Sequence, residues 1–472
     1  MPINSFLYPS GALPSAYTID NSLRFDDGSN DNLQKNFGVT LNAKKFTLSF
    51  WLKRSTLGTT QRIIEGALTS NPTYSDGFLE ITSGDQIRLF SELANTARVN
   101  STYTPLLRDV SAWYHIVLSC DTDQATATDR NILYINNNRY NGSANPSLGA
   151  VIPIISWTSS WDTKIGQSYG GANDFDGYLA EFYYIDGQQL DATSFGETDE
   201  DTGIWKPIKY TGTYGTYDFY LDFENSGSLG ADVSGNGNDF TVNNLTSVDQ
   251  STDTPTNNFN TTNPLFNFTS ASTGTTYSEG NLVNTHSTSY SYSLGTFAVS
   301  QGKWYWEIKP TSVTNSAASN GVGVIKANTN PTSYPFGVAA NDAKVYSTNG
   351  QKHSNAGSVS FGDSYTSNDI IGVALDMDNG KLFFSKNGTW QNSGDPAAGT
   401  GFAYDDLDTS DFYTPFTADN QTAFTAIFNH NYGSPPYSIT SGNSDANGYG
   451  NFEYTVPNSY FCLNSKNLAE YG

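Results

Sequence analysis

Cysteine is almost missing from this chain of 472 residues, which has two. Cys120 and Cys462 cannot form a disulfide framework, and both lie in apolar runs, so we predict two buried free thiols. Long apolar runs are missing too, since no stretch approaches the roughly 18 apolar residues of a membrane-spanning helix. The first residues have neither a basic nor an apolar signal region. We therefore expect a protein that is made in a cytoplasm, does not insert into a membrane and acts outside only after lysis.

Basic residues are scarce. The chain has 23 Lys and Arg against 46 Asp and Glu, a formal net charge of −23. Such an excess repels phosphate backbones and anionic lipid, so we expect no binding to nucleic acid or to an anionic membrane surface. Neutral or cationic ligands, divalent cations and colloidal stability remain as explanations of the acidity.

Aromatic residues and glycine are abundant, with 30 Tyr, 28 Phe, 8 Trp and 43 Gly. Aromatic side chains fit the pleated surface of a sheet, and glycine and asparagine fit its turns. Long runs with helical spacing do not occur. In the run 46–54, Phe46, Leu48, Phe50 and Leu52 alternate with mostly polar residues, which is typical of a half-buried strand. The sequence therefore predicts an all-β protein.

Strand-like runs recur at short intervals up to about residue 245 and again from about 291. Many short strands separated by turn residues favour antiparallel β-sandwiches. Between these parts, Thr, Asn, Ser and Asp dominate and aliphatic residues are rare. We therefore predict a first domain at 1–245, an extended connection at 246–290 whose aromatic residues argue against a floppy linker, and a second domain at 291–472.

The second half resembles the SPRY family. The resemblance lies in "GKWYWEIKP" at 302–310, in "GVGVIK" and "NDIIGVALDMDNGKLFFSKNGTW", and in the following "YTPFTA". It implies a bent antiparallel β-sandwich that recognises protein or glycan-bearing partners through surface loops, without catalysis.

The first half resembles the concanavalin A-like jelly rolls of the laminin-G and lectin/glucanase type. The resemblance lies in "SLRFDDGSNDNL", "FTLSFWLKR", "AWYHIVLSCD", "ILYINN" and, most specifically, "IGQSYGGANDFDGYLAEFYYIDGQQL" at 165–190. The resemblance implies a two-sheet jelly roll, and such folds include lectins, which bind sugars, and glycoside hydrolases, which cleave them.

The order of segments resembles proteins of tailed bacteriophages. "MPINSFLYPSG", "GIWKPIKYTGTYGTYDFYLDF", "DVSGNGNDFTVNNLTS" and "DTPTNNFNTTNPL" precede the SPRY-like part. This resemblance implies a virion structural protein, such as a tail fibre, an appendage or a capsid decoration. Other virion subunits and host cell-surface glycan are then the expected partners. A homo-oligomer fits such a role, although no coiled-coil heptad repeat supports it.

Catalytic patterns are scarce. Glycoside hydrolysis needs two carboxylates across the scissile bond, and the E-x-D-x-x-E string of jelly-roll glucanases is missing. Glu181 is followed by aromatic residues, and Asp186 lies at an expected turn. We expect His115 to be a core residue of a strand. His353 and His430 are expected near turns, and no Ser-His-Asp or H-E-x-x-H set can be assembled. We therefore predict no enzymatic activity and no catalytic residue, with a polysaccharide depolymerase as the alternative.

Calcium is the one cofactor that the resemblance suggests, because jelly rolls of this type often hold Ca²⁺ at one rim through carboxylate and carbonyl oxygens. Asp26 and Asp27 follow an early strand, and Asp174 and Asp176 lie in "GGANDFDG". The alternative is that these residues decorate hairpin turns.

Aromatic residues outside the alternating core are candidates for stacking against sugar rings. Trp157 and Trp161 are expected on a Ser/Thr-rich loop, Trp390 after an Asn-Gly turn, and Tyr169, Tyr334 and Tyr346 are further candidates. Packing at the edge of the core is the alternative. Trp51, Trp113, Trp304 and Trp306 fall within expected strands and are predicted to be structural.

The run 372–390 resembles a calcium-binding loop in composition, but its residues do not have the spacing of an EF-hand loop. Counting from Asp376, Gly380 is the fifth residue, where an EF-hand has glycine at the sixth, and the twelfth is Asn387 instead of Glu. A hairpin with Asn379-Gly380 as a two-residue turn fits better. Asp376 and Asp378 would then face solvent or a partner.

Two function classes remain open from the sequence. The preferred one is a virion protein that binds host glycan without catalysis, with weak single-site affinity raised by many copies. The rival is a purely structural particle protein whose domains contact neighbouring subunits.

Overall fold

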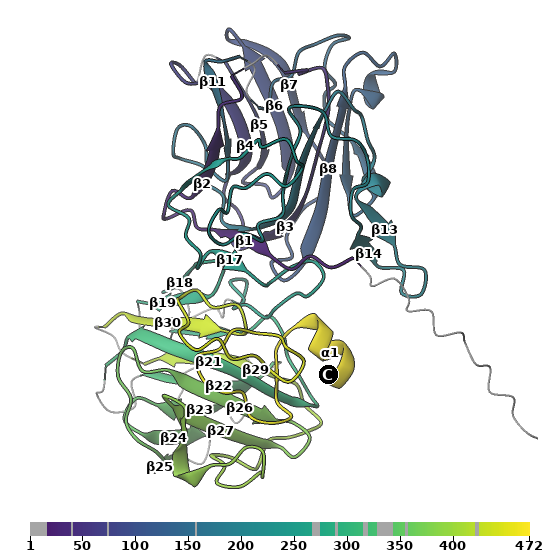
Figure 1. Cartoon of the computed structure of the whole chain (residues 1–472). Coiled ribbons are helices and arrows are strands. Elements are labelled where there is room, and N and C mark those ends of the chain that lie inside the picture. Colours follow the sequence, from purple (N-terminus) through teal and green to yellow (C-terminus); the bar gives the residue numbers. More distant parts are fainter. Residues whose placement is uncertain are drawn as a thin grey trace, which may run out of the picture.

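The chain folds into two β-sandwiches stacked end to end (Figure 1). The computed structural model describes residues 17–38, 41–72, 75–155, 158–266, 274–287, 291–314, 320–327, 343–354, 357–420 and 424–472. Pairing between the strands is antiparallel, except for one short parallel pair in the second domain. The predicted all-β fold of two antiparallel sandwiches is confirmed.

The first domain packs an eight-stranded sheet against a seven-stranded one. The eight-stranded sheet runs β10 (Asn138–Asn141), β9 (Asn131–Ile135), β8 (Trp113–Asp121), β3 (Lys45–Arg54), β12 (Gly177–Asp186), β1 (Ser22–Phe25) and β17 (Gln250–Ser251), with β15 (Phe219–Leu221) beside β12. The other runs β16 (Thr241–Asn243), β2 (Asn32–Lys35), β11 (Trp161–Ile165), β4 (Gln61–Leu68), β5 (Asp76–Ile81), β6 (Ile87–Leu93) and β7 (Thr96–Thr102).

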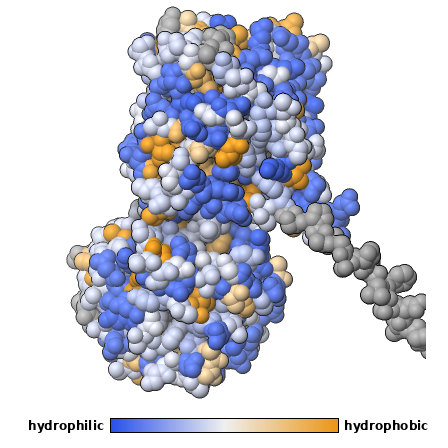
Figure 2. Space-filling model, in the orientation of Figure 1, coloured by the Kyte–Doolittle hydropathy of each residue, from blue (hydrophilic) through white to orange (hydrophobic). Residues whose placement is uncertain are grey.

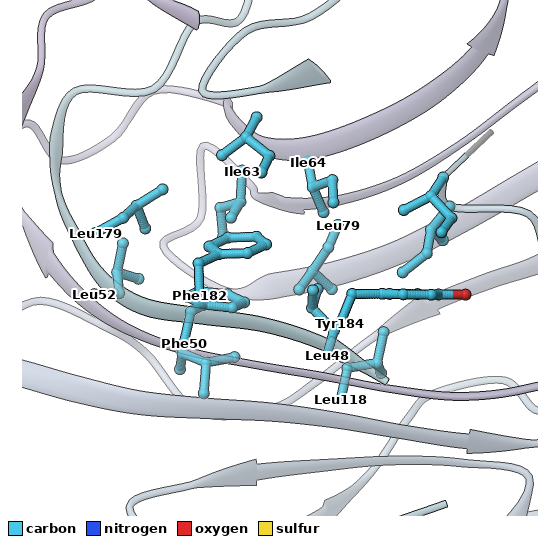
Figure 3. Close-up of a cluster of buried hydrophobic side chains, with 14 of the residues drawn as sticks. Leu48, Phe50, Leu52, Ile63, Ile64, Leu79, Leu118, Leu179, Phe182 and Tyr184 are labelled. Atoms are coloured by element: carbon cyan, nitrogen blue, oxygen red, sulfur yellow. The ribbon is translucent and has the colours of Figure 1, made fainter. Parts of the chain in front are cut away.

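The core of the first domain follows from the alternation seen in the sequence. Leu48, Phe50 and Leu52 of β3 point between the sheets and are fully buried. They meet side chains from β12 and β8 on their own sheet and from β4 and β5 on the opposite one, as Figure 3 shows. The rings of Phe50 and Phe182 stack with centroids 5.0 Å apart. Burial of these apolar faces is what holds the two layers together.

The second domain also has two sheets. One runs β18 (Thr275–Ser278), β19 (Val283–His286), β30 (Ala426–Asn431), β21 (Lys303–Ser312), β26 (Ile371–Asp376), β27 (Lys381–Lys386) and β28 (Thr389–Trp390), with β31 (Phe461–Cys462) parallel to β21. The other runs β20 (Ser291–Leu294), β29 (Tyr413–Asp419), β22 (Asn320–Lys326), β23 (Ala343–Ser347), β24 (Gln351–Ser354) and β25 (Gly357–Ser360).

Small elements complete the chain. The strands β13 (Gly196–Thr198) and β14 (Trp205–Pro207) form a separate hairpin, and 3₁₀ turns occur at Ala127–Asp129, Ala192–Ser194 and Gln391–Ser393. The one α-helix among the described residues is α1 (Ser465–Tyr471), near the end of the chain. Within the described ranges, no helix is long and apolar enough to cross a membrane.

The predicted hairpin around residue 379 exists, with a different turn. Asp376 pairs with Lys381, so the loop between β26 and β27 has four residues and is wider than the predicted Asn379-Gly380 turn. Asp376 is 1% exposed and does not face solvent. Its carboxylate accepts hydrogen bonds from the main-chain and side-chain nitrogens of Asn379 and pairs with Lys303 at 3.0 Å. These local bonds favour the wider loop, because they satisfy the amide inside it.

The polar stretch that we predicted as a connection is buried in part, mainly over residues 251–262. Its first part contributes β17 to the first domain, and its last part contributes β18 and β19 to the second. Phe259, Asn260, Thr261 and Thr262 are at most 2% exposed. Hydrogen bonds take the place of apolar contacts here. The Asn260 main chain, for example, donates to the carbonyl of Leu463 at 2.9 Å.

A buried ion pair lies where this stretch meets the first domain. The ammonium of Lys53 lies 2.7 Å from a carboxylate oxygen of Asp253, and both side chains are 1% exposed. Lys53 also donates to the side chain of Asn258 at 2.8 Å and to the carbonyl of Phe259 at 3.2 Å. The indole of Trp113 donates to the other oxygen of Asp253 at 3.1 Å. A buried charge needs such partners, so Lys53 fixes the stretch against β3.

Direct contacts between the domains add to this seam. The hydroxyl of Tyr178 donates to the carbonyl of Gly280 at 2.9 Å, and Asn281 donates to the carbonyl of Ser55 at 3.0 Å. Arg24, which is 1% exposed, pairs with Glu279 of the second domain at 3.2 Å. The two domains are therefore joined by a polar, buried interface.

Candidate functional site

A hollow of about 550 Å³ opens on the second domain between two late segments of the chain. Trp390, Asp395 and Pro396 line it from one side, and Tyr454, Val456 and Asn458 line it from the other. The volume falls in the range of small-molecule sites. Trp390 and Tyr454 are half-buried, so each ring has one part in the core and another facing the hollow.

A tight turn places Trp390. Asn387 and Gly388 both have positive φ, 47° and 77°, as the two central residues of a tight hairpin turn require. The Asn387 side chain accepts a hydrogen bond from the main chain of Ile370 at 2.8 Å and donates to Asp369 at 2.7 Å. The turn then leads directly into β28, whose second residue is Trp390. Its ring meets the edge of Tyr305, with centroids 6.4 Å apart.

Glu307 positions the opposite wall of the hollow. This side chain is fully buried, and its carboxylate accepts hydrogen bonds from the main-chain nitrogens of Glu453 at 2.9 Å and Tyr454 at 2.8 Å. It also accepts one from the hydroxyl of Tyr305 at 3.0 Å, the ring that meets Trp390. Burial raises the pKa of Glu307. One buried carboxylate thus ties both aromatic walls to the same strand, β21.

The close fit at Gly388 shows how tightly this wall is built. A Cβ at this position would lie 2.5 Å from the ring of Tyr454, which no real side chain tolerates. Only glycine lets the Tyr454 ring lie against the turn. The walls therefore form a preorganised site.

The chemistry of this hollow suits a neutral polar ligand with an apolar face. The two aromatic rings offer surfaces on which a sugar ring can stack. The exposed carboxylate of Asp395 and the exposed amide of Asn458 can accept and donate hydrogen bonds at the rim. No His or Cys lines the hollow. The arrangement can hold a ligand.

The other predicted aromatic sites differ from expectation. Trp161 is the first residue of β11, not a loop residue, and it is 3% exposed because its side chain points into the sandwich. Tyr346 is fully buried. Tyr169 is half-exposed, with the ammonium of Lys164 4.9 Å from its ring centroid. Trp157 and Tyr334 lie outside the described residues.

The four predicted metal ligands do come close together. Burial and the charges of Asp26 and Asp174 raise the pKa of Asp27. Burial, together with the charges of Asp27 and Asp26, raises the pKa of Asp176 to about 8. These mutual effects place all four carboxyl groups in one electrostatic neighbourhood, at the end of the first domain that faces the second.

The hydrogen bonds of these carboxylates show that they are not arranged as a set of calcium ligands. Asp26 accepts the main-chain nitrogen of Glu279, Asp174 accepts the amide of Gln167, and Asp176 accepts the hydroxyl of Thr56. One oxygen of Asp174 and one of Asp176 are buried without a hydrogen bond, which is the feature that favours a cation. Across the described ranges, however, no three His, Cys, Asp or Glu side chains are arranged to hold a metal ion. The residues present therefore do not fit calcium.

The carboxylates considered for catalysis are enclosed. Glu181 is 4% exposed and accepts hydrogen bonds from the hydroxyls of Tyr17, Tyr183 and Tyr220 at 2.6 to 2.7 Å. It has a φ of 52° at a bulge in β12, a conformation that its three partners stabilise. Burial raises its pKa. No oxygen of Glu181 is left for a substrate.

Charged residues on the outer face of β4, β5 and β6 are also committed to one another. Glu80 is 1% exposed and lies 3.4 Å from Arg62 and 2.6 Å from Arg88. Arg62 pairs with Glu65 at 3.2 Å and stacks over the ring of Phe78 at 3.3 Å. A general acid and base need accessible carboxyl groups, and these are held in ion pairs.

The histidines are structural. His115 is buried as predicted, bonded to Ser49 at 3.0 Å and to Trp205 at 3.0 Å. His353 and His430 lie one residue from the ends of β24 and β30, near turns as predicted, and are 4% and 1% exposed. Cys120 and Cys462 are buried free thiols, as predicted. Trp51, Trp113, Trp304 and Trp306 are buried within strands, also as predicted.

Two residues that build the hollow were not singled out from the sequence. Tyr454 lines it, and Glu307 lies behind it in β21, where it alternates with buried aromatic residues. A charged residue inside an apolar strand is the one signal that pointed to Glu307, because such a group needs partners from elsewhere in the fold.

Two family models match the chain. Residues 27–188 match the concanavalin A-like lectin/glucanases superfamily, and residues 303–431 match the SPRY domain. The matched segments fall on the two sandwiches. A search among curated proteins finds no match.

Solved structures also match parts of this chain. The SPRY domain of human HERC1 is 20% identical and covers 32% of this chain and 87% of its own, with a TM-score of 0.27. A SAP-like pentraxin from Limulus polyphemus is 16% identical and covers 37% of this chain and 80% of its own, with a TM-score of 0.28. The TRIM65 PSpry domain is 15% identical and covers 36% and 91%, with a TM-score of 0.27. Residues 27–188 of this chain are thus similar to concanavalin A-like lectins and glucanases, and residues 303–431 are similar to the SPRY domain.

Proposed function

We propose that this protein is a non-catalytic glycan-binding protein of a bacteriophage particle, and that the hollow between Trp390 and Tyr454 is its sugar site. The observation that carries the proposal is the pairing of two half-buried aromatic rings over one preorganised hollow. Both domains are of types that bind carbohydrate or protein. The resemblance of the segment order to phage proteins supports the virion location.

The charge of the protein narrows the glycan class. With a net charge of −23 and Asp395 at the rim, the hollow disfavours sulfated or uronic acid-rich chains. Neutral sugars, or amino sugars carrying a positive charge, meet no such repulsion. The open rim fits a single sugar or a chain end, and many copies on one particle raise the overall affinity.

A glycan array with wild-type protein and two variants tests the proposal. The protein is presented on a multivalent carrier, because single-site binding is expected to be weak. Trp390→Ala is expected to lose binding to neutral glycans. The matched control is Phe412→Ala, which removes an aromatic ring that is 56% exposed outside the hollow. Absence of binding by the wild-type protein, or equal loss in both variants, would contradict the sugar site.

The non-catalytic part has a separate assay. The glycans that bind are incubated with the protein, and reducing ends and unsaturated sugars are measured over time. We expect neither to increase, and release of either product would support the depolymerase alternative. Mass spectrometry and electron microscopy of purified particles test the virion location.

A further inference from the structure

The strand β25 ends the six-stranded sheet of the second domain with an open edge. It pairs with β24 on one side, and among the described residues no strand lies on its other side. All four of its residues are exposed, and Val359 is 54% exposed. Figure 1 places it at the end of the second domain that is farthest from the first.

The register shows which backbone groups this edge presents. Lys352 pairs with Val359, and His353 pairs with Ser358. The main chain of Phe361 donates to the carbonyl of Gly350 at 3.0 Å, so these two residues form a hydrogen-bonded pair. Hydrogen-bonded pairs alternate along an antiparallel ladder, and the pair of Lys352 and Val359 is therefore hydrogen-bonded as well. Ser358 and Ser360 alternate with these positions. Their N–H and C=O groups therefore point away from β24, toward the open edge.

The edge lacks the usual protection. Natural sheets blunt an exposed edge with lysine, proline or charge, and the edge strands β7 and β10 of the first domain carry Arg98 and Arg139. β25 has the sequence Gly-Ser-Val-Ser, with none of these. An edge of this kind is a template for another strand.

A hollow of about 290 Å³ lies beside the strand and supplies specificity. Val359 shares its face with Lys352 and, one strand further, with the core residue Tyr346. Here the inner face of the sheet extends beyond the opposite layer, and the hollow is lined by Val359, Tyr404 and Asp405 among others. An apolar side chain of an added strand would cover Val359, which is the exposed apolar group here.

Charged groups of both signs surround this hollow. Lys344 pairs with Asp406 at 2.7 Å, whereas Lys352 donates to the neutral carbonyl of Ala403 and keeps its positive charge. Asp405 is exposed at the rim. On a chain with a net charge of −23, a cationic side chain is also favoured at longer range.

We propose that the open edge of β25 binds an extended segment of a partner protein by strand addition, with an apolar residue and a basic residue two positions apart on the face toward the hollow. The spacing follows from the strand period, because residues i and i+2 share a face. Ser358 and Ser360 provide the main-chain hydrogen bonds, Val359 contacts the apolar side chain, and Asp405 pairs with the basic one. This surface is separate from the Trp390 hollow and does not depend on the glycan proposal.

The probe is a capped seven-residue peptide, Ser-Thr-Val-Thr-Lys-Thr-Ser, added to the full chain. We expect it to protect the amides of Ser358 and Ser360 from hydrogen exchange. The same peptide with glutamate in place of lysine is expected to bind about tenfold more weakly, since it meets Asp405 with a like charge.

Two protein variants separate strand addition from other binding. Ser358→Pro removes an outward N–H, and an edge strand tolerates proline there, so we expect an unchanged melting temperature and at least about tenfold weaker binding. Ser358→Ala keeps the N–H and is expected to bind like the wild type. Val359→Lys gives a second route, because it places a cation where the apolar side chain docks.

Three results would overturn the proposal. The first is unchanged peptide affinity in Ser358→Pro. The second is protection of amides elsewhere without protection at β25. The third is dimerisation of the free protein that Ser358→Pro abolishes, which would assign the edge to a second copy of this chain.

Discussion

The two domains have the same two-layer architecture but use charge differently. Every arginine of the chain lies between residues 24 and 139, and the second domain has none. In the first domain Arg54 and Arg62 are buried against carboxylates, and the main core is one continuous cluster. Both domains have two smaller buried apolar clusters beside the main one, and the second domain presents the hollow at Trp390.

This difference shows what a shared fold leaves open. The planar guanidinium of arginine pairs with carboxylates in fixed geometry, so it can close a polar face with internal ion pairs. The first domain does this on β4, β5 and β6. The second domain leaves aromatic rings at its surface instead. The resemblance to lectin-like jelly rolls pointed to sugar sites in the first domain, yet the accessible aromatic hollow is in the second.

The largest expected effect concerns the buried interface between the domains. If the two domains were independent, changes at this interface would have little effect on stability. Lys53→Met leaves Asp253 buried without its cation, and such a loss costs about 3–5 kcal/mol. Denaturant unfolding measures it. The control is Lys206→Met, at a solvent-exposed pair with Asp199, where we expect a much smaller change in the free energy of unfolding. Equal small effects in both variants would contradict a structural role for the seam.

The next largest effect compares one tryptophan from each domain, Trp161 and Trp390. Trp161→Ala in the first domain removes a buried side chain and is expected to lower the free energy of unfolding by about 3–5 kcal/mol. Trp390→Ala in the second removes a half-buried one and is expected to cost about 1–2 kcal/mol. Thermal melting of both variants tests the order. A reversed order would show that the ring of Trp390 is part of the core and not of a site.

The pH dependence is expected to have opposite signs in the two domains. Burial raises the pKa of Asp176 to about 8, so between about pH 4 and pH 8 the folded first domain holds a proton that the unfolded chain has lost. Its stability therefore falls as the pH rises. Burial lowers the pKa of His286 and His430 to about 3, so the second domain loses stability as the pH falls below 6.5. Each group contributes about 1.4 kcal/mol per pH unit within its window.

Hydrogen exchange at about pH 8, 6.5 and 5, corrected for the intrinsic rate, separates the two domains. Asp176→Asn keeps the shape of the side chain and is expected to flatten the response of the first domain from about pH 8 to 6.5. His115 also lies in the first domain, and burial lowers its pKa, so below pH 6.5 it opposes the rise in stability that Asp176 gives as the pH falls. A response of equal sign in both domains over the whole range would contradict the assignment.

The smallest expected effect concerns calcium. A ligand that binds only the folded state raises the melting temperature. Because Asp26, Asp174 and Asp176 are engaged in hydrogen bonds and form no ligand set, we expect EDTA and added Ca²⁺ to leave the melting temperature unchanged. A rise with Ca²⁺ that Asp176→Asn abolishes would show that the two unsatisfied carboxylate oxygens accept a cation after all.

The sequence was most informative about strands. Alternation predicted β3 and its core face. Trp161, Thr163 and Ile165 of β11 alternate in the same way, but Trp161 was predicted on a loop. The Ser/Thr-rich neighbours of Trp161 obscured that pattern. The stretch 246–290 was harder, because its burial rests on hydrogen bonds of Asn, Thr and Asp. Hydropathy does not register burial of that kind.

The candidate site was predictable only in part. The Asn-Gly turn before Trp390 is present, and the ring lies half-buried beside the hollow while it also packs at the edge of a buried cluster, which was the alternative. Tyr454 reaches the same hollow from 64 residues further along the chain, through main-chain bonds to Glu307. A contact at that distance depends on the tertiary fold, and no local pattern encodes it.

The most direct test of the central claim is a titration of the full chain with the neutral glycan that the array selects, followed through the indole N–H signal of Trp390 by NMR. We predict that this signal shifts on binding, and that Trp390→Ala weakens binding at least about tenfold while Trp161 keeps its signal. An unshifted Trp390 signal at saturation, with wild-type affinity in Trp390→Ala, would contradict the account.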